Sequence, residues 1–266
     1  MKTAIRSTLA ALAVLPALAF AHSPFLLPSV TILSKPAWIT VDGSATEELF
    51  DYSAPLRLNE LLISAPDGSA VAPENDLTGK LRRVFDLNLQ QAGTYRITGV
   101  SGGLAARYKD AEGKNKSWRG MAADFEKSVP KDAPELKLSE SAGLVEAFVT
   151  VGKPTALKAS GKGLEMLPTT HPNDLYSGEE ARFRFTLDGK PVAAGTKVEV
   201  IAGGRRFRDA NEAMELQTDA NGEVKVKWPN PGMYRIEASA SDDKTSLPQI
   251  KERRLTYAAT LEVLPQ

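Results

Sequence analysis

The sequence contains no cysteine among its 266 residues. Disulfide bonds, thiolate metal ligands and a cysteine nucleophile are therefore all excluded, and stability has to come from the burial of apolar side chains. An exported protein without disulfides fits a bacterial periplasm better than a harsher extracellular setting.

Histidine is almost as scarce, because His22 and His171 are the two histidines of the chain. A Ser-His-Asp triad would have to use one of them. None of the 33 carboxylates stands in a motif that indicates acid–base catalysis. The sequence therefore predicts a protein that is not an enzyme.

An excess of charge of either sign is also missing. The chain has 33 basic and 33 acidic residues, and removal of the predicted leader, with Lys2 and Arg6, leaves 31 basic residues against 33 acidic ones. A chain this close to neutrality has no global field to attract a polyanion. The balance argues against nucleic acid as a partner.

The first 21 residues have the anatomy of a secretory signal peptide. Two basic residues precede an apolar stretch over residues 9–18, and an Ala-Phe-Ala site ends at Ala21. A membrane span needs about 20 apolar residues, whereas this stretch is shorter and is interrupted by Pro16. We therefore expect residues 1–21 to be cleaved, which leaves an exported, periplasmic chain that begins at His22 and has no membrane span.

Short segments in which apolar and polar residues alternate dominate the rest of the chain. In "EARFRFTLDGKPV", this alternation runs up to an Asp188-Gly189 pair, which predicts a hairpin. Regular strand spacing with turn signals is typical of antiparallel sandwiches of immunoglobulin-like type. The sequence predicts an all-β protein with two immunoglobulin-like β-sandwich domains, at residues 22–155 and 164–266, and a linker at 156–163.

The alternation is lost between residues 101 and 141, where the sequence predicts a long loop with a short helix near residues 121–127. A loop of this length inside a compact domain is usually functional or mobile. Two interpretations stay open: a binding lid, or a solvated loop with Trp118 packed against the sheet. The segment mixes cations with aromatic residues, namely Arg107, Tyr108, Lys109, Lys114, Lys116, Trp118 and Arg119.

The two histidines predict a metal site. An N-terminal His22 offers its α-amine and Nδ1 to one ion, and His171 can supply a third nitrogen, a set that suits copper(II) especially and nickel(II) or zinc(II) as well. The amine has a reference pKa of only about 7.7–8.0, so a metal can displace its proton near neutral pH. Asp174 offers a carboxylate. The predicted cofactor is a transition metal ion (Cu, Ni, Co, Zn or Fe) at His22, His171 and Asp174. The alternative is that His22 holds no ligand and that His171 hydrogen-bonds a turn.

Several segments also resemble a known family. They are "AHSPFLLPS", "GTYRITG", "AFVTVGKPT", "LEMLPTTHPNDLYSGEEARFRFTLDGKPVAAGTKVEV" and "TDANGEVKVKWPNPGMYRIEA". Together they resemble the NikM-like periplasmic proteins, whose function is largely unknown and which are often labelled as periplasmic components of cobalt/nickel transport. The resemblance implies a leader cut that exposes His22, immunoglobulin-like domains, and periplasmic handling of transition metals with His171 in the site.

Three functional hypotheses follow. The first is a periplasmic metal-binding protein that assists metal uptake or homeostasis, with a membrane metal transporter or receptor as its partner. The second is a non-enzymatic interaction module that binds a protein or a glycan through residues 101–141. The third is a copper oxidase built on the N-terminal histidine, for which the sequence offers no recognisable substrate face.

Overall fold

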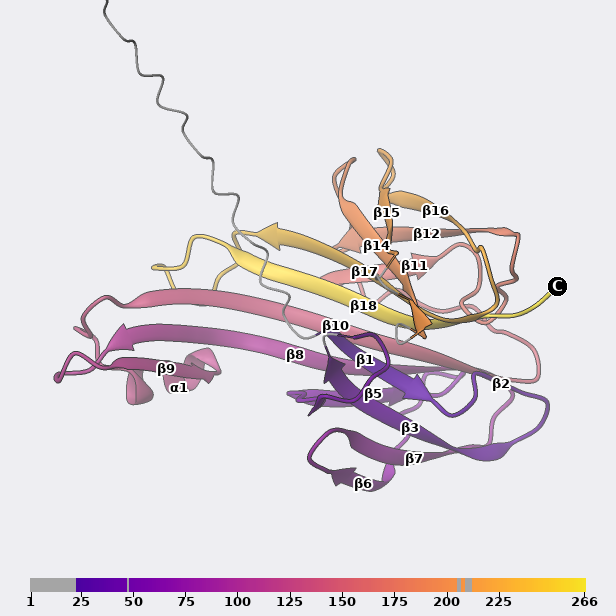
Figure 1. The fold of residues 1–266 in the computed structure, drawn as a ribbon, viewed down its shortest axis with the longest axis horizontal. Helices are drawn as coiled ribbons and strands as arrows, with labels where there is room; N and C mark the ends of the chain where they lie inside the picture. The colour runs from indigo at the N-terminus through magenta and orange to yellow at the C-terminus, as the bar shows by residue number, and fades with distance from the viewer. Residues whose placement is uncertain (1–22, 47, 205–206, 209–211) are drawn as a thin grey trace, which may run out of the picture.

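A computed structural model describes residues 23–46, 48–204, 207–208 and 212–266. The predicted signal peptide and His22 lie outside the described residues. The fold is all-β, as predicted, and Figure 1 shows its sheets as layers that share one long central sheet. In the described part of the chain, the helix α1 (Ala122–Ser128) is seven residues long, and no helix there has the length and apolar character of a membrane span.

The central sheet has nine strands and takes strands from both halves of the chain. Its main path runs β15-β14-β17-β18-β10-β8-β5, with β2 beside β10 and β9 beside β8. Its strands are β2 (Ile32–Leu33), β5 (Glu60–Ser64), β8 (Gly93–Lys109), β9 (Asn115–Gly120), β10 (Lys137–Val151), β14 (Lys197–Ala202), β15 (Met214–Gln217), β17 (Gly232–Asp242) and β18 (Arg253–Val263).

A five-stranded sheet covers one face of this central sheet. Its strands are β1 (Ser23–Pro28), β3 (Ala37–Thr46), β4 (Ala54–Pro55), β6 (Glu74–Thr78) and β7 (Arg83–Leu89). In β7 every second residue is buried, with Phe85, Leu87 and Leu89 turned inward. These side chains pack with Ile97 and Val145 of the central sheet in the first hydrophobic core.

A four-stranded sheet covers the opposite face. Its strands are β11 (Leu164–Pro168), β12 (Glu180–Leu187), β13 (Lys190–Pro191) and β16 (Glu223–Lys227). Phe183 and Phe185 of β12 face the second core, together with Tyr257 of β18. The predicted hairpin at Asp188-Gly189 is confirmed, since both residues have positive φ and Leu187 pairs with Lys190.

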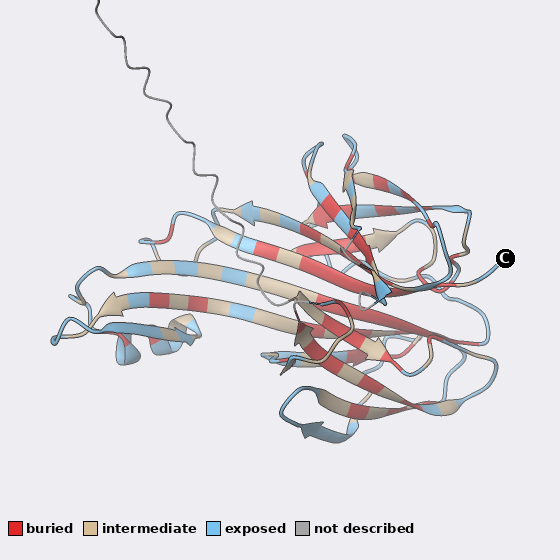
Figure 2. Cartoon of the chain, viewed as in Figure 1, coloured by how far each residue is buried: buried red, intermediate tan, exposed pale blue. Residues whose placement is uncertain are grey.

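Two sandwiches thus share their middle layer. Residues 145–151 of β10 are buried without a break, because successive side chains enter the two cores on opposite faces. A parallel pairing of β10 (Glu140–Ala147) with β18 (Arg253–Thr260) joins the halves. Figure 2 shows buried residues concentrated where the layers overlap. The predicted immunoglobulin-like sandwiches are confirmed. The structure adds that the two sandwiches share their middle sheet.

The predicted long loop at 101–141 is wrong. Strand β8 continues to Lys109, turns into β9, and β10 already begins at Lys137. These strands extend as an arm beyond both covering sheets (Figure 1). The sequence did not indicate these strands because one face of the arm carries small and charged residues, which weakens the alternation of apolar and polar positions. The short helix predicted near 121–127 is confirmed as α1.

Two glycines stand at the base of the arm. Gly102 and Gly103 have φ of +126° and +124°, a region that side-chain-bearing residues rarely adopt. A Cβ on Gly102 would lie 2.3 Å from the Ser141 carbonyl oxygen, and one on Gly103 would lie 2.6 Å from the Gly120 oxygen. Strand β8 can change its neighbour from β5 to β9 here because both positions are glycine.

Candidate functional site

His171 lies at the junction of the two sandwiches, and both of its ring nitrogens have hydrogen-bond partners. Nδ1 accepts from the backbone N–H of Asn173 at 3.1 Å. Nε2 lies 3.2 Å from the Thr155 carbonyl oxygen and 3.0 Å from Thr94 Oγ1. Since a carbonyl can only accept, this network assigns the proton to Nε2. In this arrangement neither nitrogen presents a free lone pair to a metal.

The charge state of His171 agrees with that network. Desolvation lowers the pKa of His171, and the hydrogen bond to Thr155 and the charge of Asp174 oppose this only in part. A neutral imidazole is therefore the stable form at neutral pH. The ring ties the segment after β11 to β8 and to Thr155, the last residue of the predicted first domain, which is a structural role.

The other predicted ligands do not complete a metal site among the described residues. Asp174 is exposed, and its backbone N–H donates to the carbonyl oxygen of His171 at 2.9 Å. No group of three or more His, Asp or Glu side chains suited to a metal occurs within residues 23–46, 48–204, 207–208 and 212–266. Because His22 lies outside the described residues, the metal site stays a prediction.

A buried ion pair lies one strand row away from His171. Glu146 is fully buried and accepts from Arg96 Nε at 2.7 Å and Nη2 at 3.0 Å, from Thr98 Oγ1 at 2.7 Å and from Tyr257 Oη at 2.7 Å. Arg96 Nη1 also donates to the Lys158 carbonyl oxygen at 2.9 Å. Burial raises the pKa of the Tyr257 hydroxyl, and so does the adjacent Glu146 charge. All groups are paired, so the cluster holds the halves together instead of forming a reactive site.

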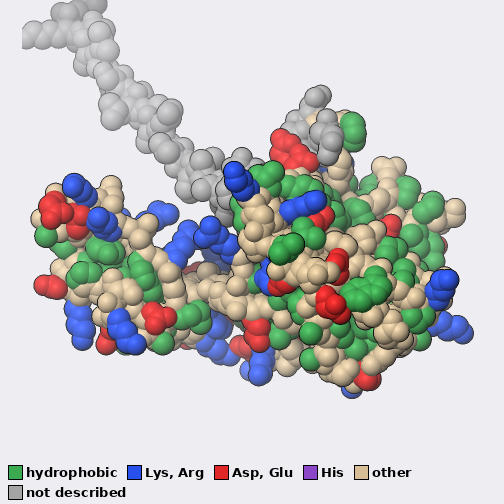
Figure 3. Space-filling view, turned by 90° about the horizontal axis from the view of Figure 1, so that it is seen from below, with side chains coloured by type: hydrophobic (Ala, Val, Ile, Leu, Met, Phe, Trp, Pro, Cys, Tyr) green, Lys and Arg blue, Asp and Glu red, His purple; other side chains and the backbone are tan. Residues whose placement is uncertain are grey.

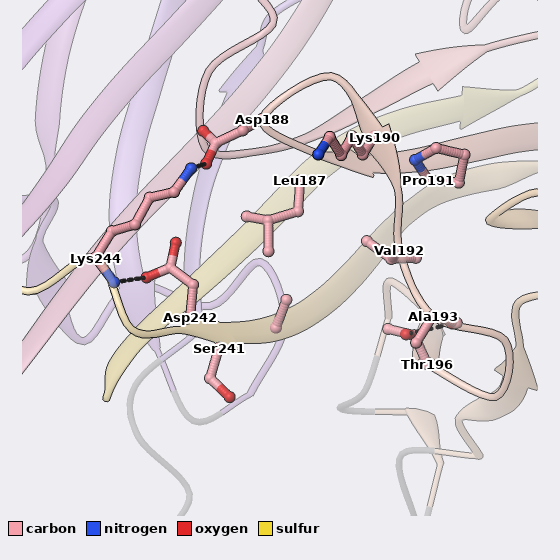
Figure 4. Close-up of a pocket in the computed structure, with 11 residues that line it drawn as sticks. Leu187, Asp188, Lys190, Pro191, Val192, Ala193, Thr196, Ser241, Asp242 and Lys244 are labelled. Atoms are coloured by element: carbon pink, nitrogen blue, oxygen red, sulfur yellow. Dashed lines mark hydrogen bonds and ion pairs between the residues drawn. The ribbon is translucent and has the colours of Figure 1, made fainter. Parts of the chain in front are cut away.

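A hollow of about 500 Å³ lies between the β12–β13 hairpin and the end of β17. Figure 4 shows Lys244 reaching from the rim to Asp188, while its backbone N–H donates to Asp242. Arg253 also binds Asp242, at 2.6 Å. The hydrogen bond from Lys244 lowers the pKa of Asp188, and that from Arg253 lowers the pKa of Asp242. Both carboxylates are thus neutralised by cations, and neither is set up as an acid or a metal ligand.

A match to a nucleophile motif occurs in "GVSGG", where Ser101 occupies the serine of G-x-S-x-G. That motif requires a sharp turn between a strand and a helix. Ser101 instead lies inside β8, and its Oγ donates to the Gly143 carbonyl oxygen at 3.4 Å. His171 contacts Thr94, seven residues away along the same strand. The geometry of a nucleophile elbow is absent at Ser101.

The arm carries the strongest candidate site, on the face that no other layer covers. We call this surface the open face. It consists of Gly103, Ala105 and Arg107 on β8, Ser117 and Arg119 on β9, Lys137, Ser139 and Ser141 on β10, and Arg254 on β18.

Strand register places these residues on one side of the sheet. Lys137, Arg107 and Ser117 form one row of paired residues, and Ser139, Ala105 and Arg119 form the next. Ser141 then pairs with both Gly103 and Arg254. Paired residues in neighbouring strands point to the same side, and the four cations and three serines are all exposed. A hollow of about 490 Å³ lies over the first two rows.

The four cations of the open face have no acidic neighbour that neutralises them. Within the described residues, no ion pair includes Arg107, Arg119, Lys137 or Arg254, whereas Lys109 and Lys116 nearby are paired with Glu135 and Asp110. At the outer end of the open face the acidic neighbour is Glu135, which is paired with Lys109 one row beyond Arg107, and at the inner end it is Glu237, two rows beyond Arg254. Figure 3 shows basic side chains on the arm and at the waist that joins it to the body.

The aromatic residues of the arm point to the opposite side. Leu104, Ala106, Phe125, Val129 and Ile250 form a small third core there, with Tyr108 and Trp118 packed against it. The Trp118 ring meets Phe125 edge-on, with centroids 5.7 Å apart. Of the two interpretations of Trp118, packing against the sheet is confirmed, because its ring lies against the third core. Sequence reasoning listed Arg107 and Arg119 but missed Lys137 and Arg254, which only strand register places beside them.

Fold and surface together define a class of protein: an all-β protein of two fused immunoglobulin-like sandwiches with an exposed cationic sheet face. A family profile described as "Domain of unknown function (DUF4198)" matches residues 19–242. The chain therefore belongs to this family. A comparison with curated proteins finds no significant match.

The solved structures that a comparison finds have low identity to the chain and low TM-scores. Trypsin-activated α2-macroglobulin from Escherichia coli is 12% identical with a TM-score of 0.25, over 92% of this chain and 16% of its own. The D0–D1 domain of intimin is 10% identical with a TM-score of 0.23, over 90% of this chain and 97% of its own. Elastase-activated E. coli α2-macroglobulin is 11% identical with a TM-score of 0.22, over 89% and 30%. These likenesses carry no functional argument.

Proposed function

We propose that this protein is a non-enzymatic binding module that holds a polymer bearing repeated anionic groups on the open face of its arm. The observation that carries the proposal is a set of four exposed cations on one uncovered sheet face, Arg107, Arg119, Lys137 and Arg254, which have no ion-pair partner in the part of the chain that the structure describes. The predicted periplasmic location and lack of catalysis belong to the same proposal.

Charge complementarity supports an anionic ligand. Arginine presents several donors in a planar fork that matches carboxylate, sulfate or phosphate oxygens. The cations surround glycine, alanine and serine side chains, so their charged ends stand above the local surface and a ligand group can reach them. The chain carries no net positive charge that would attract an anion. A local cluster of cations, and not the field of the whole protein, therefore has to provide the attraction.

The test is a titration of the mature full chain with dextran sulfate, with neutral dextran as the uncharged probe. We expect dextran sulfate alone to bind, with an affinity that falls as salt rises. In the triple variant Arg107→Gln/Arg119→Gln/Lys137→Gln, the affinity should fall at least about tenfold, since exposed charge contacts contribute up to about 1 kcal/mol each.

A matched control keeps the same change in net charge. Lys114→Gln/Lys127→Gln/Lys131→Gln removes three exposed cations of the arm that lie off the open face. This control should bind dextran sulfate nearly as well as the wild type. Equal losses in both triple variants, or no binding by the wild type at low salt, would contradict the proposal. Folding of each variant is checked by its urea midpoint, because exposed substitutions change stability by only about 0.5 kcal/mol.

The transition-metal role implied by the NikM-like resemblance is a separate proposal. It rests on His22, His171 and Asp174, and its partner would be a membrane metal transporter or receptor. The hydrogen bonds at both nitrogens of His171 do not favour it. For this reason the open face ranks first.

A further inference from the structure

We propose that the polymer held on the open face is an anionic polysaccharide, with carboxylate or sulfate groups on its sugar rings. This inference rests on the proposed function and names the chemistry of its ligand. The composition of the open face, and not its charge alone, carries it.

The first step is the polar surface between the cations. Ser117, Ser139 and Ser141 are exposed on the open face, and Ser239 and Thr256 continue the hydroxyl-bearing surface in the row beyond Arg254. A hydroxyl both donates and accepts, which matches the hydroxyl groups of a sugar ring. Cations alone would suit any anion, whereas a surface that alternates cations with hydroxyls fits a ligand that alternates charged groups with hydroxyls.

The second step is the spacing of the cations. Residues two apart along a strand lie about 6.7 Å apart, and neighbouring strands lie about 4.8 Å apart. Arg107 and Lys137 share one row, Arg119 is in the next, and Arg254 is in the third. The charges are therefore spread over three rows and four strands, which favours an extended ligand with separated anionic groups over one compact anion.

The third step excludes an acidic protein surface. Energetically dominant contacts in protein interfaces come from large apolar, aromatic or arginine side chains in desolvated pockets. The three arginines of the open face are exposed and lie in no desolvated pocket, and its largest apolar side chain is that of Ala105. Trp118 and Tyr108 pack in the third core on the other side of the sheet. A membrane surface is disfavoured for the same reason, since the residues that make up the open face carry no apolar side chain larger than alanine.

The fourth step concerns nucleic acids, which also carry repeated charge. Proteins that bind single strands stack the bases on aromatic side chains, and the open face offers none. The two aromatic residues of the arm strands are committed to the third core. Sugar rings with their own charged groups need no such stacking surface.

The experiment compares polymers that differ in backbone but share carboxylate charge. The mature full chain is titrated with polygalacturonate, poly-L-glutamate and single-stranded oligothymidylate at one low salt concentration. We expect polygalacturonate to bind at least about tenfold more tightly than poly-L-glutamate, because only the sugar polymer offers hydroxyls to Ser139 and Ser141.

A pair of serine variants separates the hydroxyl contribution from the charge contribution. Ser139→Ala/Ser141→Ala should weaken polygalacturonate binding about three- to tenfold and leave poly-L-glutamate binding unchanged. The control Ser34→Ala/Ser128→Ala removes two exposed serines that lie off the open face and should change neither. Arg254→Gln should weaken polygalacturonate binding, which tests the third row.

The outcomes distinguish this inference from the proposed function. Equal or tighter binding of poly-L-glutamate or oligothymidylate, lost in the Arg107/Arg119/Lys137 variant, would overturn the polysaccharide inference while the anionic-polymer proposal stands. Insensitivity of polygalacturonate binding to the two serine substitutions would also overturn it. If no polyanion binds, dextran sulfate included, both proposals fall.

Discussion

Substitution of Arg96 tests how much its buried ion pair in the shared sheet contributes to the stability of the protein. Arg96 is the cation that faces Glu146, which is fully buried, and it meets both carboxylate oxygens. Desolvation lowers the pKa of Arg96, but attraction to Glu146 outweighs it, so the pKa is raised and the group stays charged. Arg96→Met keeps a side chain of similar reach and leaves the carboxylate without its counter-charge.

The expected cost follows from the partners that remain. Removing one member of a buried ion pair typically costs about 3–5 kcal/mol. Thr98 and Tyr257 still donate to Glu146 in the variant, so we expect the lower end, about 3 kcal/mol. For a chain of this size that corresponds to a fall in Tm of about 6–12 °C.

Urea unfolding followed by tryptophan fluorescence measures the effect, since Trp228 is fully buried. The double variant Arg96→Met/Glu146→Gln is the matched control. Its amide carries no charge and can still accept from Thr98 or Tyr257, so it should recover most of the lost stability. A loss below about 1 kcal/mol in Arg96→Met, or a double variant no more stable than the single one, would refute the reasoning.

Three further predictions concern the other features of the fold. Because the pKa of His171 is lowered in the folded state, the unfolded chain binds more protons than the folded chain below about pH 6.5. The free energy of unfolding should therefore fall as the pH drops through that range. In His171→Ala, the urea midpoint should fall less between pH 7.5 and 5.0 than it does in the wild type. Gly102→Ala should lower the free energy of unfolding by about 2 kcal/mol, because of its positive φ and its contact with the Ser141 oxygen. Gly113→Ala, which is also at positive φ but in open space, should lower it by about 1 kcal/mol. Similar urea midpoints for the two variants would contradict the role of Gly102. If His22 and His171 hold a transition metal, calorimetric copper(II) titration of the mature chain should lose at least tenfold in affinity in His171→Ala, and an unchanged titration would remove His171 from the predicted site.

Much of the fold could be predicted because many strands show a local alternation of apolar and polar residues. The segments around Phe85, Phe183 and the Asp188-Gly189 turn carry their strand period and turn chemistry within a few residues. The helix α1 was also visible locally. These features depend on neighbours in the sequence, and the structure confirms them.

The arm and its open face were hidden for a physical reason. In "GLAARYK" and "KLSES" the side chains on the exposed side are small or charged, while the inward positions hold alanine and leucine. A weak two-residue period was present at Leu104, Ala106 and Tyr108, yet it does not reveal which strands pair. The neighbours of Lys137 come from β8, and those of Ser141 from β8 and β18. Such long-range register is a tertiary property, and sequence reasoning had no access to it.

The predicted linker illustrates the same limit. Its residues were expected to connect two independent domains, because the segment contains few bulky apolar residues. In the structure the Lys158 carbonyl oxygen accepts a hydrogen bond from Arg96. The N–H groups of Ser160 and Gly161 donate to the buried carboxylate of Glu165. Its hydrogen bonds instead anchor it to both sandwiches.

The parallel pairing of β10 with β18 has a consequence for how the chain folds as it is made. Ala258 of β18 belongs to the first hydrophobic core, and β18 follows every strand of the four-stranded sheet along the chain. The first hydrophobic core therefore stays incomplete until all of those strands and β18 have been synthesised. A chain that ends near residue 155 would expose the edge of β10 and should remain prone to association. The two halves are joined only when β18 pairs with β10.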